Sequence, residues 1–325
     1  GQAAARGGVT TICAMPNTKP VIDNGEKVLD VHRRAKEDSP VHVIQLGAIT
    51  VGQQGEVLAD LEGMAKAGCH AISEDGKSVM NASLYRRAMK IAKDNDISIF
   101  AHCEDITMVE GGVMHADEKA KALGLKGITN AVEDVIVARD ILLAKETGVR
   151  LHLCHCSTED SVKLVEAAKK EGLPVTAEVC PHHFAMCTDD ITEDDGNFKM
   201  NPPLRSPEDR EAILQGVLDG TIDMIATDHA PHSAEEKGRG LEKSVFGIVG
   251  LETAFPVLYT ELVKTGILTL EHLVELLAIN PRTRFGIPMK DDEWCAWNII
   301  DATRVDPEQF LTMGKASPFT GREVF

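Results

Sequence analysis

The segment from Asp223 to His232 ends a short apolar run in side chains that can bind a metal or transfer a proton. Its apolar part, Met224 to Ala226, has the length of a strand that is buried on both faces. Three polar residues follow that run: Asp228, His229 and His232. Such groups at a buried strand end are costly unless they bind something or reach solvent. A solvated strand end would explain one such segment equally well, so the interpretation depends on whether the pattern recurs.

The same pattern recurs after other apolar runs. Three of these runs lead into His102, His155 and the pair His182–His183, and another leads into Asp75. Imidazole and carboxylate groups together suit Zn²⁺ and similar divalent ions. Such an ion lowers the pKa of bound water from about 15.7 towards 7 and polarises a carbonyl, while a nearby carboxylate carries the proton. The pattern predicts metal-assisted hydrolysis, with Asp228 as the proton carrier because it is the only acid at the end of its strand.

Parallel strands could bring these side chains together, and the chain alternates strand-like with helix-like segments. Strands are expected near residues 9, 41, 71, 97, 149, 175 and 224. This alternation predicts an α/β fold with a parallel sheet, which fits both a doubly wound sheet and a (β/α)8 barrel. Polar residues at the C-terminal end of nearly every strand favour the TIM-type barrel, because barrel active sites are built there. A doubly wound sheet would usually show a glycine-rich phosphate loop, and the sequence has none.

A complete barrel needs one strand more than these patterns provide. The chain has no initiator methionine and runs from Gly1 through Gly8 straight into a strand. We therefore expect residues 1–290 to form a barrel that lacks its first strand, in a piece of a longer chain. From about residue 291 the helical period is lost, and 294–300 and 321–325 are expected to be short β segments. Residues 291–325 are accordingly expected to be the remnant of a small β-sandwich domain packed against the barrel.

The composition argues against several other classes of protein. The 325 residues include 34 Lys plus Arg and 51 Asp plus Glu, giving a formal net charge of −17. This balance argues against nucleic-acid binding, because neutralising phosphates requires clustered cations. No apolar run approaches the roughly 20 residues of a membrane span, and no signal-peptide pattern is present. The eight cysteines are scattered, several of them in or beside apolar runs, which predicts reduced core thiols in a cytoplasmic protein.

Seven short motifs make the chain resemble bacterial dihydroorotases of the class I type, in the amidohydrolase superfamily. In chain order they are MPNT (15–18), SEDGKS (73–78), AHCED (101–105), HCST (155–158), VCPHH (179–183), NPPLR (201–205) and ATDHAPH (226–232). The resemblance extends from about residue 1 to the end of the chain. NPPLR together with DHAPH is fairly specific, whereas MPNT alone is shared with allantoinases and dihydropyrimidinases. The resemblance implies a metal-dependent (β/α)8 barrel that interconverts dihydroorotate and N-carbamoyl-L-aspartate in pyrimidine synthesis.

The resemblance also implies a metal centre built from four residues of this chain. Asp75 would bridge two Zn²⁺ ions, and His102 and His155 would bind the second ion. Asp228 would bind the first ion and act as the general acid and base. Two ions roughly 3.5–4 Å apart would share the attacking hydroxide.

A substrate site is implied in the same way. Asn17 and His232 would hold the substrate carboxylate, and Asn201 would contact the ring amide. Arg205 is either a cation of this site or an anchor for its loop, and the sequence does not separate these roles. Residues 233–243 are charged and contain glycine, which fits a mobile lid and a solvated loop equally well.

The chain departs from the family pattern at several positions. The His-x-His-x-Arg signature that follows the first strand is absent, which agrees with the missing strand and removes two expected ligands of the first ion. SEDG stands where SDDG is common, and this change keeps Asp75. Cys156 and Cys180 stand where Val and Thr are usual, and they are expected to be core thiols. His182 and His183 are expected to be structural or to support the site, since His155 already fills the ligand role.

Two other functions fit the same residues. Allantoinases and dihydropyrimidinases bridge their metals with a carboxylated lysine, whereas this chain offers Asp75 there, with Lys77 two residues further on. An inactive barrel could instead be a scaffold subunit for aspartate transcarbamoylase, although the four retained ligands argue against this. For an active dihydroorotase we expect dihydroorotate and N-carbamoyl-aspartate as ligands, a homodimer, and a possible association with aspartate transcarbamoylase.

Overall fold

Seven parallel strand positions form the centre of the computed structural model, which describes residues 1–291 and 293–325. Strand order follows chain order, and every pairing in this centre is parallel. The strands are β1 (Thr11–Ala14), β2 (His42–Gln45) continued by β3 (Gly47–Ala48), β4 (Ala71–Ser73), β5 (Ser98–Ala101), β8 (Leu151–Leu153), β9 (Val175–Val179) and β10 (Met224–Ile225). The strands expected from the sequence are confirmed, and their order is that of a (β/α)8 barrel whose two end strands are β1 and β10.

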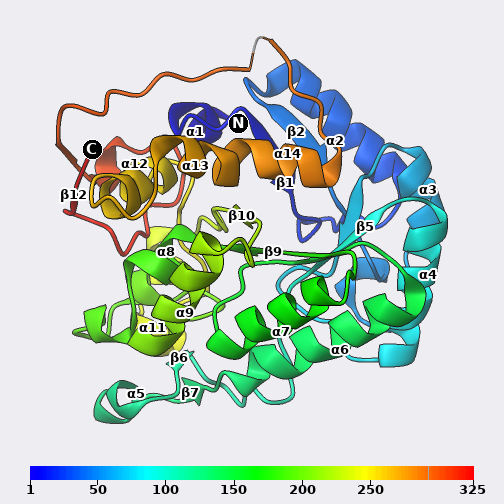
Figure 1. Ribbon diagram of the computed structural model, residues 1–325, viewed down its shortest axis with the longest axis horizontal. Helices are drawn as coiled ribbons and strands as arrows, with labels where there is room; N and C mark the ends of the chain where they lie inside the picture. The colour runs from blue at the N-terminus through cyan, green and yellow to red at the C-terminus, as the bar shows by residue number, and fades with distance from the viewer. Residues whose placement is uncertain (292) are drawn as a thin grey trace.

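Helices cover the outside of this sheet and alternate with its strands. Figure 1 shows them following one another around the molecule, from α2 in blue to α7 in green. They are α2 (Gly25–Asp38), α3 (Leu61–Lys66), α4 (Ala82–Asp94), α6 (Ala131–Thr147), α7 (Glu159–Lys170) and α9 (Pro207–Leu218). Each of these helices packs against the next one in the series. Helices that follow one another in the predicted alternation are therefore also neighbours in the structure.

Capping side chains explain where several of these helices begin and end. Asn24, Asn81, Thr158 and Ser206 each accept a hydrogen bond from a main-chain N–H in the first turn. Such caps satisfy donors that have no partner inside the helix. Helix α6 ends at Gly148, whose φ of 69° lies in the left-handed region that glycine adopts easily. These local signals limit the length of the loops between helices and strands.

Shorter elements lie between and after the strands of the barrel. Between β5 and α6 are β6 (Met114–His115), α5 (Glu118–Ala122) and β7 (Gly127–Ile128); between β9 and α9 are α8 (Pro181–Ala185), η2 (Thr188–Asp190) and η3 (Gly196–Phe198). After β10 come α10 (Ala234–Lys237), α11 (Gly240–Lys243), α12 (Ala254–Leu258), η4 (Tyr259–Val263), α13 (Leu270–Val274), η5 (Glu275–Ile279) and α14 (Asn280–Phe285). The first part of the chain adds α1 (Gln2–Arg6) and η1 (Val51–Gln53). Within the described ranges, no helix combines the length and apolarity needed to cross a bilayer.

The core has an outer and an inner part, because side chains alternate along each strand. Leu151 and Leu153 of β8 join the main core between sheet and helices. The ring of His152, between them in sequence, packs instead against Phe100 and Phe285. Side chains therefore fill the inside of the barrel at this level, as is usual for barrels.

A buried carboxylate fastens β10 at its N-terminal end. Asp223 accepts hydrogen bonds from Ala177 N at 2.9 Å and from Lys169 Nζ at 2.6 Å. Arg284 of α14 lies 3.1 Å from its other oxygen, and Asn280 donates to its main-chain carbonyl at 2.8 Å. The C-terminal helices are therefore tied directly to this end of the sheet.

Residues 293–325 run over the outside of the C-terminal helices, as the orange and red trace in Figure 1 shows. Here β11 (Thr303–Arg304) pairs antiparallel with β12 (Glu323–Val324), and η6 (Pro307–Gln309) lies between them. The β segment expected within 321–325 is confirmed by β12. The one expected over 294–300 is wrong, because these residues form no strand. Trp297 instead stacks on Phe255, with ring centroids 4.4 Å apart.

We expect Leu153→Ala to destabilise the protein by about 2–5 kcal/mol, because it leaves a cavity in the core between β8 and its helices. Leu142→Ala on α6 is the matched control, since that side chain is 66% exposed and should cost less than about 0.5 kcal/mol. Urea unfolding followed by circular dichroism measures both changes. Equal midpoints for the two variants would contradict the proposed packing.

Candidate active site

Three of the predicted ligands converge at the C-terminal ends of neighbouring strands. Asp75 follows β4 by two residues, His102 follows β5 directly, and His155 follows β8 by two residues. Each offers one ligand atom, and these atoms all lie within 4.8 Å of one another. They meet because adjacent parallel strands end at the same edge, where barrel active sites are formed. This edge, with the loops that follow it, is called the rim below.

The two histidines of the rim face each other through ring nitrogens. His102 Nδ1 and His155 Nε2 are 3.0 Å apart, and both side chains are buried. Burial, followed by the charge of His102, lowers the pKa of His155 to about 4, so this imidazole is neutral and can bind a metal. Zinc–nitrogen bonds of about 2.0–2.1 Å bring two such nitrogens to a similar separation. The donor set therefore fits a divalent cation.

Asp228 follows β10 by three residues and lies near enough to Asp75 and His102 for their charges to act on its carboxyl group. Burial first, and the charge of Asp75 second, raise the pKa of Asp228 well above its usual range, while His102 opposes this. A bound divalent cation would remove the repulsion between two carboxylates inside the protein. Asp228 and His155 also have positive φ angles of 44° and 37°. Such backbone strain in residues other than glycine gathers at functional sites.

Two of the three predicted substrate residues lie against carboxylates of the rim. Asn17 donates from Nδ2 to Asp75 Oδ2 at 2.7 Å, and Asn201 donates from Nδ2 to Glu104 Oε1 at 2.9 Å. The third, His232, has its Nδ1 3.8 Å from a carboxylate oxygen of Glu236 in α10. The structure thus brings Asn17 and Asn201 to the rim, and it places His232 in the segment that follows β10.

Glu104 was not singled out by the sequence. Its carboxylate is buried and lies 3.2 Å from His102 Nε2 through Oε2. The motif AHCED held a usable signal, because residues two apart in extended chain point to the same side. A carboxylate two residues after a predicted ligand could therefore have been placed beside it.

The structure places Arg205 as a loop anchor. Its guanidinium is buried, donates to Ser157 Oγ at 3.0 Å and to the carbonyl of Ile128 at 3.1 Å, and lies 3.6 Å from Glu133. Glu133 also accepts hydrogen bonds from Ser157 N and Ser161 Oγ, both at 2.8 Å. Arg205 therefore ties the NPPLR turn to the starts of α6 and α7.

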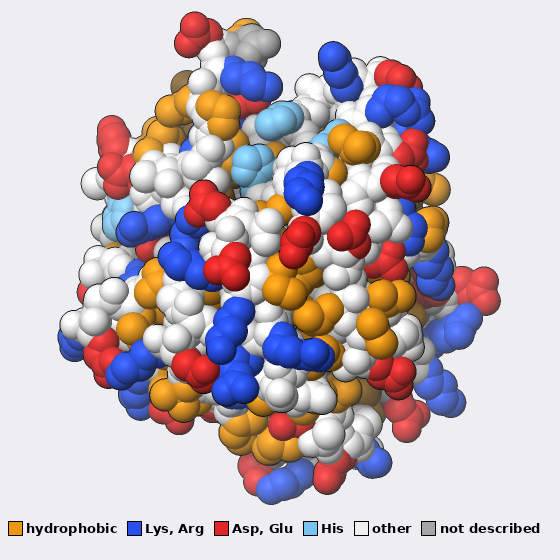
Figure 2. Space-filling model, turned by 90° about the vertical axis from the view of Figure 1, so that its right-hand side faces the viewer, with side chains coloured by type: hydrophobic (Ala, Val, Ile, Leu, Met, Phe, Trp, Pro, Cys, Tyr) orange, Lys and Arg blue, Asp and Glu red, His pale blue; other side chains and the backbone are white. Residues whose placement is uncertain are grey.

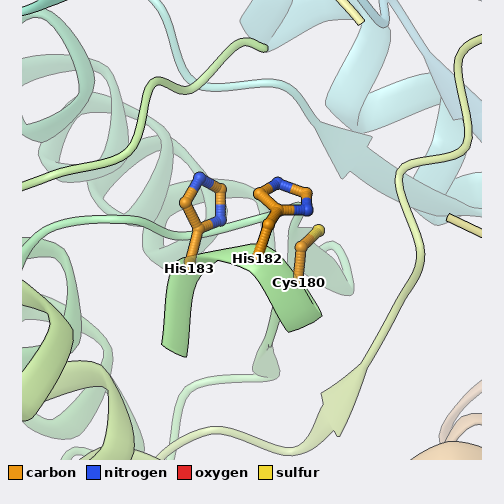
Figure 3. A group of neighbouring side chains, drawn as sticks. All are labelled: Cys180, His182 and His183. Carbon is orange, nitrogen blue, oxygen red and sulfur yellow. The ribbon is translucent and has the colours of Figure 1, made fainter. Parts of the chain in front are cut away.

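A second group of donor side chains lies at α8, as Figure 3 shows. Cys180, His182 and His183 are buried, and their ligand atoms lie within 4.8 Å of one another. His183 Nε2 contacts the carbonyl of Pro202 at 3.1 Å, so it ties α8 to the NPPLR turn. This contact agrees with the structural role expected for the histidine pair. A third group, at the inside of β8 and β9, consists of His152, Cys154 and Glu178.

Residues 233–243 pack onto the protein through two buried side chains. Lys237 donates to the carbonyls of Lys199 at 2.8 Å and Val245 at 2.9 Å. Burial, followed by the charge of Lys199, lowers the pKa of Lys237 to about 8. Leu241 is fully buried, and its N–H donates to Asp194. The structure therefore shows residues 233–243 in a packed conformation.

A separate hollow lies at the opposite, N-terminal ends of the strands. Its volume is about 660 Å³, and His32, His42 and His70 are among its lining residues. Figure 2 shows histidines gathered in a hollow near the top of that face, with basic and acidic side chains interspersed over the helices below. The hollow lies away from the rim, so it does not take part in the chemistry of Asp75, His102 and His155.

A parallel barrel with carboxylates and imidazoles at its rim defines a class of protein, the metal-dependent barrel hydrolases. Comparison with known proteins narrows this class. The family model described as dihydro-orotase-like matches residues 1–161. A protein named dihydroorotase from a Geobacillus species is 50% identical over 98% of this chain and 76% of its own length. A Bacillus cereus protein of the same name is 49% identical over the same shares of each chain.

Solved structures of similar proteins share the fold. An L-hydantoinase (dihydropyrimidinase) from Arthrobacter aurescens has a TM-score of 0.85 at 27% identity, over 99% of this chain and 75% of that one. A dihydroorotase from Saccharomyces cerevisiae, solved with 5-fluoroorotic acid, has a TM-score of 0.77 at 15% identity, over 99% and 90%. From the level and extent of identity to the curated relatives, the chain belongs to the dihydroorotase family of amidohydrolases.

We expect Arg205→Met to lower the free energy of unfolding by about 3–5 kcal/mol, because it leaves Glu133 buried without its cationic neighbour. Arg87→Met, on an exposed surface of α4, is the control and should change stability by less than about 0.5 kcal/mol. Chemical unfolding measures the difference. If Arg205→Met left stability unchanged but raised the KM, Arg205 would be a substrate cation and not an anchor.

Proposed function

We propose that this chain catalyses the reversible ring opening of (S)-dihydroorotate to N-carbamoyl-L-aspartate, a step of UMP biosynthesis. The observation that carries the proposal is the convergence of Asp75, His102 and His155 within 4.8 Å, in a member of the dihydroorotase family. The reaction adds water across a cyclic C–N bond of an amide. The water oxygen bonds to the carbonyl carbon, and the ring nitrogen leaves with a proton.

Asp228 is proposed to carry the proton of this reaction. It takes a proton from the attacking water and returns it to the leaving nitrogen, which requires a carboxylate that can hold a proton transiently. Asp228 follows β10 at the C-terminal edge of the sheet, where a carboxylate can reach the attacking water. Asn201 is proposed to contact the ring amide, and Asn17 and His232 the substrate carboxylate.

The family depends on metal, and we propose Zn²⁺ as the ion, two per complete site. Nitrogen and oxygen donors of the kind found at the rim suit zinc. Asp75 would bridge the ions, His102 and His155 would hold the second, and Asp228 would hold the first. When bound, the ions lower the pKa of water and polarise the scissile carbonyl. The 325 residues contain no His-x-His pair, so the residues proposed here supply only part of the donor set expected for the first ion.

The similarity to the Arthrobacter enzyme favours the hydantoinase-like alternative. The residue at the bridging position of the rim does not, because it is an aspartate. A carboxylated lysine would have to replace Asp75 as the bridge. Lys77 instead donates from Nζ to the main-chain carbonyl of Gln53 at 3.0 Å. An inactive scaffold is disfavoured because Asp75, His102, His155 and Asp228 are all retained. A carboxyl group found on Lys77 by mass spectrometry would favour the hydantoinase-like alternative.

Four further proposals concern the domains, location and partners of the enzyme. Residues 291–325 are proposed to be part of a small β-domain on the barrel, supported by β11 and β12 and by the 2.6 Å ion pair between Arg322 and Glu261. A cytoplasmic location is supported by the eight free cysteines, all within the described residues. A homodimer and an association with aspartate transcarbamoylase are supported by the family resemblance alone, and size-exclusion chromatography tests both.

Removal of metal is expected to abolish turnover of dihydroorotate by the full-length protein, and added Zn²⁺ should restore it, because water at neutral pH is a poor nucleophile without the ion. The measurement is the absorbance change on ring opening after dialysis against a chelator. Hydantoin and dihydrouracil serve as comparison substrates. Turnover of either comparison substrate without turnover of dihydroorotate would contradict the proposed substrate.

Asp228→Asn is expected to lower kcat by about 10²–10⁴-fold, because the amide cannot accept and return the proton. Asp160→Asn, on the exposed surface of α7, is the control and should leave kcat unchanged. Steady-state kinetics with dihydroorotate measures both. A fully active Asp228→Asn enzyme would exclude this residue as the proton carrier.

A further inference from the structure

The carboxylate of Glu104 joins the metal side of the rim to its substrate side. Oε2 lies 3.2 Å from His102 Nε2, and Oε1 accepts a hydrogen bond from Asn201 Nδ2 at 2.9 Å. His102 comes from the end of β5, whereas Asn201 comes from the turn before α9, 97 residues further along the chain from Glu104. One buried side chain therefore contacts two residues with different proposed tasks.

A nearby hydroxyl holds Glu104 in place. Ser78 Oγ donates to the carbonyl of His102 at 2.7 Å and accepts from the N–H of Glu104 at 3.1 Å. This bridge fixes the backbone between the histidine and the glutamate. The Glu104 side chain is only 12% exposed, so water competes weakly for its two oxygens. The position of Glu104 is thus set by the protein and not by solvent.

The contact with His102 selects which ring nitrogen can bind a metal. A carboxylate only accepts hydrogen bonds, so His102 Nε2 must carry the proton in this contact. In the neutral form that binds a metal, His102 therefore has its lone pair on Nδ1, the atom that lies 3.0 Å from His155 Nε2. Second partners of this kind orient metal-binding histidines and make them more basic.

The contact with Asn201 selects which way its amide points. Nδ2 donates to Glu104, so Oδ1 is turned the other way and is free to accept a hydrogen bond. A cyclic amide substrate presents ring N–H groups, which are donors. The geometry therefore suits acceptance of a substrate N–H by Asn201, and a flipped amide would offer a donor instead.

We propose that Glu104 is a positioning residue that couples metal binding at His102 to recognition of the substrate amide by Asn201. The proposal has two parts. The contact of Glu104 with Asn201, called the Asn201 arm, rests on the proposed function, whereas its contact with His102, called the His102 arm, does not. Loss of Glu104 frees His102 to adopt the other tautomer and Asn201 to rotate. Metal affinity and substrate affinity should therefore fall together, although Glu104 touches neither ligand.

The test compares Glu104→Ala, Glu104→Gln and Asn201→Ala in the full-length protein. Affinity for Zn²⁺ is measured without substrate, by competition with a chromophoric chelator, and KM and kcat for dihydroorotate are measured at saturating Zn²⁺. Glu104→Ala should weaken metal affinity about 10–100-fold and raise KM. Asn201→Ala should raise KM and leave metal affinity unchanged. The KM effects should not multiply in the double variant, because both changes break one contact.

Asp105→Ala is the matched control, because the carboxylate of this neighbouring acid accepts hydrogen bonds from Thr107 alone among the described residues. Unchanged metal affinity in Glu104→Ala overturns the His102 arm, and an unchanged KM overturns the coupling. If Glu104→Ala does not fold, the nearly isosteric Glu104→Gln decides, since it can accept only one of the two hydrogen bonds and must weaken at least one readout. If the wild type does not turn over dihydroorotate, the proposed function fails, while metal affinity still tests the His102 arm.

Discussion

The register between β5 and β8 sets the distance on which the candidate site depends. Ala101 pairs with Leu153, so the two strands end side by side. His102 follows the first strand and His155 follows the second, and their ring nitrogens come to 3.0 Å. A shift of one residue in the pairing would turn one imidazole to the other face of the sheet, because side chains alternate with a period of two. The hydrophobic core that fixes this register therefore also fixes the donor geometry.

The sequence was sufficient to predict the strands and their convergence. Each strand is a local apolar run, and in a parallel barrel the ends of such runs must share one edge. Asp75, His102 and His155 could be grouped for this reason alone. The segment 294–300 shows the limit of local patterns. Its Trp and Ile residues are typical of strands, but a strand also needs a partner, and Trp297 finds an aromatic surface on Phe255.

Residues whose roles depend on distant partners could not be predicted from the sequence. Glu104 matters through Asn201, and Arg205 through Glu133, which are far apart in the chain. No periodicity records such contacts. They form because a buried charged or polar group must find a partner. Glu133 joins the starts of α6 and α7 to the NPPLR turn. Its buried hydrogen bonds therefore hold loops that the apolar core does not contact.

Asp223 and Asp228 stand at opposite ends of β10 and have opposite surroundings. Asp223 is surrounded by Lys169, Arg284 and a main-chain N–H, whereas Asp228 has a strained backbone and another acid nearby. The favourable contacts of Asp223 at the N-terminal end can offset the free-energy cost of the strained, repelling surroundings of Asp228 at the C-terminal end. A barrel divided in this way can exchange the residues of its upper loops over evolution while its scaffold persists. New specificities in such a chain should therefore arise in the loops after β10, while the ion pairs of Asp223 with Lys169 and Arg284 at its other end stay intact.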